Sequence, residues 1–162
     1  MDIKVDWNDI RKHFTSCFRS NYFVSIASVD EENCPTVTPV GSLFLGHHQD
    51  GFYFEKYLSR LPQHANHNRK ICILAVNSSI WFWLKSLFQG IFRSNPAIRL
   101  YGELGEKREA TEAEKSRFRA RIRSTRGLKG NHYLWDDMQY VREVTFTRAE
   151  KVNLGDMTRH LN

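Results

Sequence analysis

Short segments rich in aromatic and β-branched residues, separated by polar turns, recur along this chain and constrain its fold more than any other feature. Such segments predict β-strands, because these side chains pack well on a pleated surface. Most of the connections are short, which favours a mainly β fold, a closed or nearly closed antiparallel barrel with inserted α-helices, over a doubly wound parallel sheet. We expect six strands, at residues 22–29, 36–45, 52–56, 71–77, 97–105 and 141–152.

The second expected strand carries Pro39 and Gly41 inside it. Proline has no backbone N–H to donate to a neighbouring strand, so this segment should lie at a sheet edge or contain a bulge. Glycine lets another group approach the backbone closely. The backbone here could therefore read the polar edge of a flat ligand, although a plain edge-strand irregularity is the commoner explanation.

Three of the four expected helices lie before the expected strand at residues 97–105. Apolar residues recur at helical spacing from just after Asp6 to Cys17, which predicts an N-terminal helix. Residues 59–68 place Pro62 in the first turn of a short helix, where proline is tolerated. Residues 80–92 have the composition of an apolar helix.

The length of 162 residues suits one domain, with an N-terminal helix at 1–19, a barrel at 20–152 and a tail at 153–162. The net charge of +6 favours anionic partners without choosing among phosphates, nucleic acid and acidic membranes. Three cysteines at unrelated spacings predict neither a zinc site nor a disulfide framework, so no metal is expected. The polar N-terminus does not resemble a signal peptide and no apolar stretch is long enough to span a bilayer, so we expect a cytoplasmic protein without a membrane span.

Residues 56–60 follow an expected strand and precede an expected helix. A phosphate group needs positive charge and several hydrogen-bond donors in one place. Lys56 and Arg60 would supply the charge, Ser59 a hydroxyl, and the helix N-terminus its backbone N–H groups. From these residues alone, a solvated loop with two ordinary surface cations remains the more common alternative.

Seven short motifs follow one another along residues 20–152, and their order is more specific than any single motif. They are CPTVTPVG at 34–41, DGFYFEK at 50–56, SR at 59–60, NHN at 66–68, ICILAV at 71–76, IRLYG at 98–102 and TEAE at 111–114. In this order they resemble the pyridoxamine 5′-phosphate oxidase-like family, the FMN-binding split barrels. The resemblance implies a six-stranded antiparallel split β-barrel, FMN as the cofactor, and a homodimer with FMN at its interface.

The resemblance also implies where FMN would be held. Ser59 and Arg60 match the family's phosphate-binding pair, with Lys56 at the end of the preceding strand. The strand whose backbone lies along the flavin ring corresponds to residues 38–41. The cofactor-binding residues predicted in this way are Thr38, Pro39, Val40, Gly41, Glu55, Lys56, Ser59, Arg60 and His64.

The chain departs from the family in ways that concern its substrate. Leu61 and Pro62 stand where many members carry a second basic residue. The C-terminal Trp and Arg-x-His segment of the true pyridoxamine phosphate oxidases is absent, so the resemblance does not extend to vitamin B6 oxidation. A small-molecule substrate or electron donor is expected, its identity is open, and no catalytic residue is assigned.

The apolar helix expected at residues 80–92 has three interpretations. A core or dimer-interface helix is favoured, because more than half of its circumference is apolar. A lid over a flavin, with Trp81 or Trp83 stacking on the ring, is the second. A membrane-surface anchor is the third, since Lys85 and Arg93 lie nearby.

A basic helix is expected after Thr111 and Glu114, which have the spacing of a capping box. Basic residues alternate from Lys115 to Lys129 with no acidic residue among them. A two-residue step turns roughly 200° on a helix, so these cations should spread around it as on a solvated helix. Nucleic-acid binding and an anionic-substrate site are the alternatives, but basic and aromatic residues are not interleaved, so no nucleic acid is expected.

Three functional hypotheses therefore remain open. The first is an FMN-dependent oxidoreductase of the split-barrel type, in which the flavin carries the redox chemistry. The second is a non-catalytic split barrel that binds flavin or haem, although the seven histidines have no Cys, Asp or Glu at convincing metal spacing. The third is a basic module that binds nucleic acid.

Overall fold

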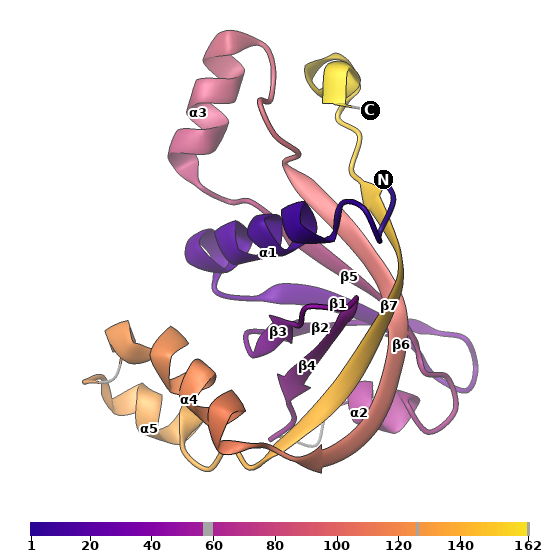
Figure 1. Ribbon diagram of the computed structural model, residues 1–162, viewed down its shortest axis with the longest axis vertical. Coiled ribbons are helices and arrows are strands. Elements are labelled where there is room, and N and C mark those ends of the chain that lie inside the picture. The colour runs from indigo at the N-terminus through magenta and orange to yellow at the C-terminus, as the bar shows by residue number, and fades with distance from the viewer. Residues whose placement is uncertain (57–59, 126, 162) are drawn as a thin grey trace.

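The computed structural model describes residues 1–56, 60–125 and 127–161. Within them, seven strands pair in one antiparallel sheet in the order β2-β1-β5-β6-β7-β4-β3, and the sheet curves strongly into a half-barrel (Figure 1). The mainly β, split-barrel prediction is confirmed. The strands are β1 (Val24–Val29), β2 (Pro35–Val40), β3 (Leu43–Leu45), β4 (Asp50–Phe54), β5 (Lys70–Val76), β6 (Ala97–Glu109) and β7 (Tyr140–Lys151).

The predicted count of six strands is wrong, because the segment expected at residues 36–45 is two strands. The break falls at Gly41 and Ser42, between β2 and β3. The Ser42 hydroxyl takes the place of a backbone partner, since its Oγ accepts from the Phe54 N–H and donates to the Phe54 carbonyl, both at 3.2 Å. β2 and β3 are the two edge strands of the sheet, so the barrel is split where the chain passes directly from one edge to the other.

The long strands β6 and β7 form the spine of the curved sheet. Their pairing slips between Tyr101 and Gly102 and again between Leu104 and Lys107, and such bulges bend a strand and increase its twist. A side chain at Gly102 would place its Cβ 2.3 Å from the Thr145 carbonyl oxygen, so this close approach requires glycine. The bend brings the two ends of the sheet around the same interior.

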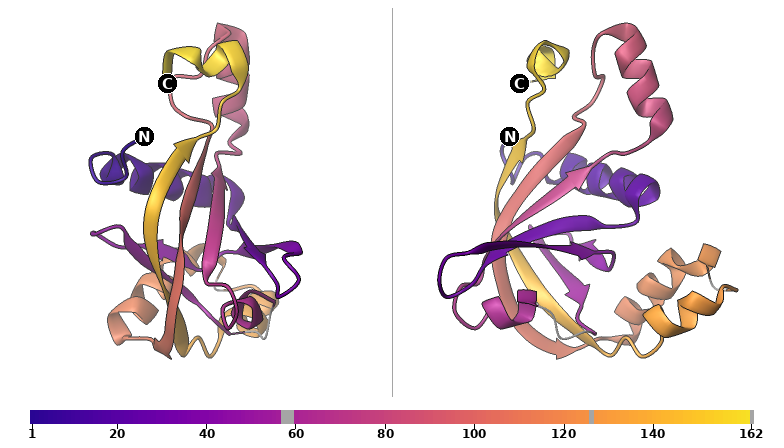
Figure 2. Two further views of the ribbon diagram at one scale, coloured as in Figure 1. Left: turned by 90° about the vertical axis from the view of Figure 1, so that its right-hand side faces the viewer. Right: turned by 180° about the vertical axis from the view of Figure 1, so that it is seen from behind.

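Some helices lie at the two ends of the half-barrel, and one lies inside its curve (Figures 1 and 2). α1 crosses the concave side of the sheet, while α4 and α5 lie together at the end opposite α3 (Figures 1 and 2). The helices are α1 (Trp7–Asn21), α2 (Arg60–His64), α3 (Ile80–Gln89), α4 (Glu112–Arg121) and α5 (Lys129–Trp135), with 3-10 turns η1 (Arg123–Thr125) and η2 (Gly155–Leu161). No helix in the described part of the chain is long and apolar enough to cross a bilayer.

Two of these helices bear directly on the sequence predictions. The capping box of α4 is confirmed, since Thr111 Oγ1 accepts from the Glu114 N–H at 3.2 Å and Glu114 Oε2 accepts from the Thr111 N–H at 2.8 Å. α5 (Lys129–Trp135) is a helix that the sequence did not predict. α5 is stabilised by tertiary packing, because the Trp135 ring meets Phe118 of α4 at a centroid distance of 5.5 Å.

The interior holds two groups of buried apolar residues. The larger lies between α1 and the sheet, where the predicted helical face of Trp7, Ile10, Phe14 and Cys17 is buried. The smaller is mostly aromatic and joins β3 and β4 to α4. Its buried members are Phe44, Phe52, Phe54, Ala110, Phe118 and Val141. This second group positions α4 against the break between β2 and β3.

Candidate cofactor site

Two residues predicted from separate motifs lie beside one short segment of chain. At Gly41, the position of a Cβ would be 3.0 Å from the Tyr22 carbonyl oxygen and 3.7 Å from the Trp135 ring. Lys56 Nζ donates to the Tyr133 carbonyl at 3.2 Å and also to the Asp136 carbonyl. Gly41 and the Lys56 side chain therefore both lie near the C-terminal end of α5.

The remaining predicted residues of β2 lie on an edge strand. Thr38 pairs with Ile26 of β1 on one side, and Pro39 occupies the kind of edge position that a residue without an N–H requires. Among the described residues, no strand pairs with the other side of β2. Val40 is buried at the end of the strand, directly before the break. The contact of these residues with a cofactor stays a prediction.

The predicted phosphate pair is only partly visible, because Ser59 lies outside the described residues. Arg60 is exposed at the start of α2 and lines a hollow of about 660 Å³ together with Asp30, Glu31 and Glu32. The hollow thus combines one candidate phosphate ligand with three carboxylates of the β1–β2 turn. The role of Ser59 and Arg60 stays a prediction.

His64 of α2 is buried, and its Nδ1 lies 3.0 Å from Ser28 Oγ of β1. This contact ties α2 to the sheet and therefore sets the position of Arg60 one turn earlier. The arrangement gives His64 a clear role in placing the segment. Its predicted contact with a cofactor stays a prediction.

Glu55 lies in a buried network of charges rather than in an open hollow. Its carboxylate accepts from Arg142 Nε at 2.6 Å and Nη2 at 3.2 Å, and Lys107 Nζ lies 3.4 Å away. The Tyr53 hydroxyl donates to the same carboxylate at 3.3 Å. Burial alone would raise the pKa of Glu55. The hydrogen bonds and charges of Arg142 and Lys107 outweigh this effect, so the pKa of Glu55 lies below its ordinary value. The charged form of Glu55 is therefore committed to joining β4, β6 and β7.

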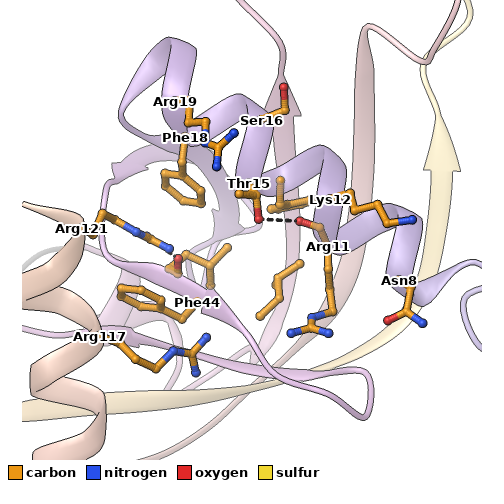
Figure 3. A pocket seen from close by; sticks show the side chains of 13 residues that line it. Asn8, Arg11, Lys12, Thr15, Ser16, Phe18, Arg19, Phe44, Arg117 and Arg121 are labelled. Carbon is orange, nitrogen blue, oxygen red and sulfur yellow. Dashed lines mark hydrogen bonds between the residues drawn. The ribbon is translucent and has the colours of Figure 1, made fainter.

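Two hollows lie between α1 and α4; the larger adjoins Gly41, and the smaller is shown in Figure 3. They measure about 620 and 930 Å³ and share much of their lining, so we treat them as one α1–α4 groove. Five basic residues line it, and among the described lining residues there is no Asp or Glu. The basic residues are Arg11, Lys12, Arg19, Arg117 and Arg121, and the aromatic ones are Phe14, Phe18, Tyr22, Phe44, Phe118 and Trp135.

Arg121 joins this groove to the break between the edge strands. Its Nη1 donates to the Gly41 carbonyl at 3.1 Å and the Leu43 carbonyl at 2.7 Å. The guanidinium lies 3.5 Å from the centroid of the Phe44 ring and 4.3 Å from that of Phe18. Burial, followed by the charge of Arg117, lowers the pKa of Arg121 to about 10. The side chain stays positive at neutral pH, and a bound anion would offset the repulsion that it experiences.

The structure divides the basic run that begins at Lys115 into separate groups. Lys115 and Arg119 approach Glu112 at 3.0 and 3.5 Å, as on a solvated helix. Arg117 and Arg121 face the groove, where Figure 3 shows them extending from α4 on either side of Phe44. Sequence analysis did not single out this pair, although a spacing of four residues places two side chains on one helical face. The prediction that the cations spread around the helix is confirmed. Two of them, Arg117 and Arg121, lie on the face of α4 that lines the groove.

The groove combines flat apolar surfaces with positive charge. This chemistry suits a planar ligand that also carries a negative charge, because aromatic walls accept the ring and guanidinium groups accept the anion. Within the described residues, no group of three or more His, Cys, Asp or Glu side chains gathers to hold a metal ion. The geometry supplies binding and orientation, and it assigns no residue as an acid or base.

No protein-family model matches the sequence, and no curated protein matches it. Solved structures do match the fold. An FMN-binding protein from Syntrophomonas wolfei aligns over 94% of this chain and 95% of its own, with a TM-score of 0.59 and 11% identity. A candidate pyridoxamine 5′-phosphate oxidase from Lactobacillus delbrueckii aligns over 86% of this chain and 90% of its own, with a TM-score of 0.53 and 16% identity. HutZ, the haem storage protein of Vibrio cholerae, aligns over 89% of this chain and 92% of its own, with a TM-score of 0.55 and 13% identity.

These proteins share an architecture with this chain over most of both lengths, at identities that carry information about the fold alone. Their names include both flavin and haem binding. The curved antiparallel sheet, split at Gly41 and Ser42, agrees with the resemblance seen in the order of the sequence motifs. The chain therefore has the split-barrel fold of the pyridoxamine 5′-phosphate oxidase-like proteins.

Proposed function

We propose that this protein binds FMN and acts as a flavin-dependent oxidoreductase on a small-molecule substrate or electron donor. The observation that carries the proposal is that Gly41 and Lys56 both lie beside residues 133–136, and that Gly41 and Trp135 line a groove of cations and aromatic rings. These two residues come from the two motifs that the sequence relates to the flavin ring and to its phosphate. Their convergence is what one cofactor spanning both motifs requires.

In this proposal the flavin ring lies near the end of β2, in the part of the groove that Gly41 and Trp135 line. The ring is flat and largely apolar, which suits aromatic walls, and its polar edge can bond to backbone groups of an edge strand. A side chain at Gly41 would occupy space between Tyr22 and Trp135, so glycine keeps this approach open. Arg121 would place a fixed positive charge beside the ring.

The phosphate of FMN would be held at the connection between β4 and α2. Lys56 and Arg60 bring positive charge to the two ends of this connection, and Ser59 contributes a hydroxyl. Three carboxylates line the same hollow as Arg60, and a dianionic phosphate would compete with them for the guanidinium. Both Lys56 and Arg60 would then bind the negative charge of the phosphate group, which the flavin ring itself does not carry.

When bound, FMN supplies electron or hydride transfer between itself and a second molecule. The protein's own contribution is to bind the cofactor, orient it and surround it with apolar walls. The basic residues of the groove would also favour a substrate with negative charge. We further propose, from the same resemblance, one cytoplasmic domain that assembles as a homodimer with FMN at the interface.

Haem binding is the second candidate, favoured by the structural likeness to the haem storage protein HutZ. The arginines of the α1–α4 groove could bind carboxylate groups of a large flat ring as well as a phosphate. Among the described residues that line the groove there is no histidine, the commonest protein ligand of haem iron. This composition favours flavin.

Titration of the cofactor-free protein with FMN tests the proposal, with binding followed by the quenching of flavin fluorescence. Arg60→Ala should weaken binding by about 1.5–3 kcal/mol, roughly 10- to 150-fold, because a charge-assisted hydrogen bond to phosphate is lost. Arg69→Ala is the matched control, since Arg69 is another exposed arginine and pairs with Glu106 at 2.8 Å. Equal affinities for these two variants would contradict the phosphate assignment.

The position of the ring is tested by a second pair of variants. Arg117→Glu reverses a charge in the groove and should weaken FMN binding about fivefold, as expected for an exposed charge worth roughly 1 kcal/mol. Arg119→Glu reverses a charge on the same helix outside the groove and should leave the affinity unchanged. Failure of the unaltered protein to bind FMN would overturn the proposed function itself.

A further inference from the structure

Helix α3 is oriented with its apolar face toward solvent. Six large apolar residues of the helix and its C-terminal end are exposed, and the stripe they form runs along its whole length. They are Ile80, Trp81, Leu84, Leu87, Phe88 and Ile91. Phe88 is 94% exposed and Trp81 81% exposed, whereas the buried position of the helix is held by Ser86. A contiguous apolar surface of this kind marks a binding surface in a soluble domain.

The orientation of α3 is set by contacts on its other face. The rings of Phe82 and Trp83 pack on Phe92 at centroid distances of 5.4 and 5.1 Å, and Trp83 Nε1 donates to the Asn77 carbonyl at 2.7 Å. The Phe92 N–H in turn donates to the Met157 carbonyl of η2 at 2.9 Å. These contacts hold the apolar stripe outward, and α3 projects beyond the end of the sheet, away from α4 and α5 (Figures 1 and 2).

The chain around this stripe is positively charged. Residues 56–102 contain no Asp or Glu. Lys85 is exposed on α3, and Arg93 lies against the end of the helix, where its Nε donates to Gln89 Oε1 at 3.1 Å. The acidic residue of neighbouring η2, Asp156, is paired with Arg159. The surface of α3 is thus apolar and aromatic with a positive border.

We propose that α3 docks on the surface of a bilayer that contains anionic lipids. Trp and Phe side chains enter the boundary between headgroups and acyl chains, and nearby Lys and Arg bind anionic headgroups. A helix of ten residues is about 15 Å long, so it lies in the interface and does not span the bilayer. Pairing of two α3 stripes in a dimer would bring the cations of both copies together, whereas an anionic surface complements them.

Co-sedimentation of the full chain with vesicles tests this proposal. The protein should bind vesicles of equal parts phosphatidylcholine and phosphatidylglycerol and bind pure phosphatidylcholine vesicles far less, and added salt should weaken the binding. Phe88→Asp should reduce the bound fraction at least about tenfold. The change removes an aromatic ring that would be buried in the bilayer, and it adds a negative charge that the anionic lipids repel. Leu128→Asp is the control, since Leu128 is an exposed apolar residue, 65% accessible, outside α3.

The fluorescence of Trp81 reports the same contact without depending on overall stability. Anionic vesicles should shift the tryptophan emission to shorter wavelength, and Trp81→Phe should remove most of this shift while binding is retained. No binding to anionic vesicles by the unaltered protein would overturn the proposal. So would a dimer, measured by light scattering, that Phe88→Asp converts to a monomer in the absence of lipid. These measurements do not involve FMN, so they stand apart from the proposed function.

Discussion

At the scale of single residues, the buried carboxylate of Glu55 joins three strands next to the proposed phosphate segment. Only 6% of its side chain is exposed, and Arg142, Lys107 and Tyr53 all contact it. A buried carboxylate with this many partners holds strands together only while every partner is present. Because Glu55 directly precedes Lys56, the network also fixes where the proposed phosphate segment begins.

Replacement of Glu55 tests this structural role. Glu55→Gln should lower the free energy of unfolding by about 3 kcal/mol, because it leaves the Arg142 guanidinium in a largely buried site without a charged partner. Denaturant unfolding measures the effect. Glu106→Gln breaks the exposed pair with Arg69 and should cost no more than about 0.5 kcal/mol. Equal losses in the two variants would show that the Glu55 network does not stabilise the fold.

Arg121 shows what single residues cannot reveal in a sequence. Its neighbours in the chain suggest one of several surface cations on a basic helix. Its position is decided by Phe18 of α1 and Phe44 of β3, which are distant in sequence and enclose the guanidinium. Such a site is created by packing between elements, so residue type and spacing alone do not predict it.

At the scale of elements, predictions that rest on local patterns were confirmed. The apolar periodicity from Trp7 to Cys17 and the capping box at Thr111 depend on residues within one or two turns of helix. Pro39 and Gly41 predicted an irregular edge strand, but the full break between β2 and β3 depends on a bond from Ser42 to Phe54, twelve residues away. The short helix α5 was missed for the same reason, since its Trp135 packs on α4.

The start of α4 predicts a specific dependence of stability on pH. Hydrogen bonds from Arg108 hold the pKa of Glu114 at about 2, below its ordinary value of 4.5. A lowered pKa in the folded state gives stability that is present above pH 4.5 and is lost as the pH falls toward 2. The free energy of unfolding should therefore decrease over this interval.

Glu114→Gln isolates this contribution. The variant should be less stable at neutral pH, and its stability should fall less between pH 4.5 and 2, because position 114 no longer takes up a proton. Denaturant unfolding at a series of pH values measures both effects. A variant whose pH dependence matches that of the unaltered protein would show that Arg108 and Glu114 do not act as a pair.

At the scale of the whole molecule, the curvature of the sheet makes the candidate site. The bulges between β6 and β7 bend the sheet, and the two edge strands β2 and β3 then follow one another across the split (Figure 1). β3, which begins at that split, lines the groove of Figure 3 together with α1 and α4. The order of the motifs predicted the fold, and only the folded chain shows that Gly41 and Lys56 lie beside the same segment.

The whole molecule also separates two surfaces with different chemistry. The groove between α1 and α4 is concave, and the proposed docking face of α3 lies beyond the end of the sheet (Figure 2). In this arrangement the protein could hold a cofactor in one place while it contacts a lipid surface with another. The sequence left α3 open between a core or dimer-interface helix, a lid and a membrane contact, and the exposed apolar stripe shows that it is not a core helix.

The visible absorption spectrum of the purified full-length protein, recorded after incubation with FMN and removal of the unbound flavin, tests the central claim most directly. We predict flavin absorption bands that stay with the protein, and FMN as the compound released when the protein is denatured. A protein that remains colourless after this treatment would contradict the account. A strong Soret band in the protein as purified, with no retention of added FMN, would also contradict it and would support the haem alternative.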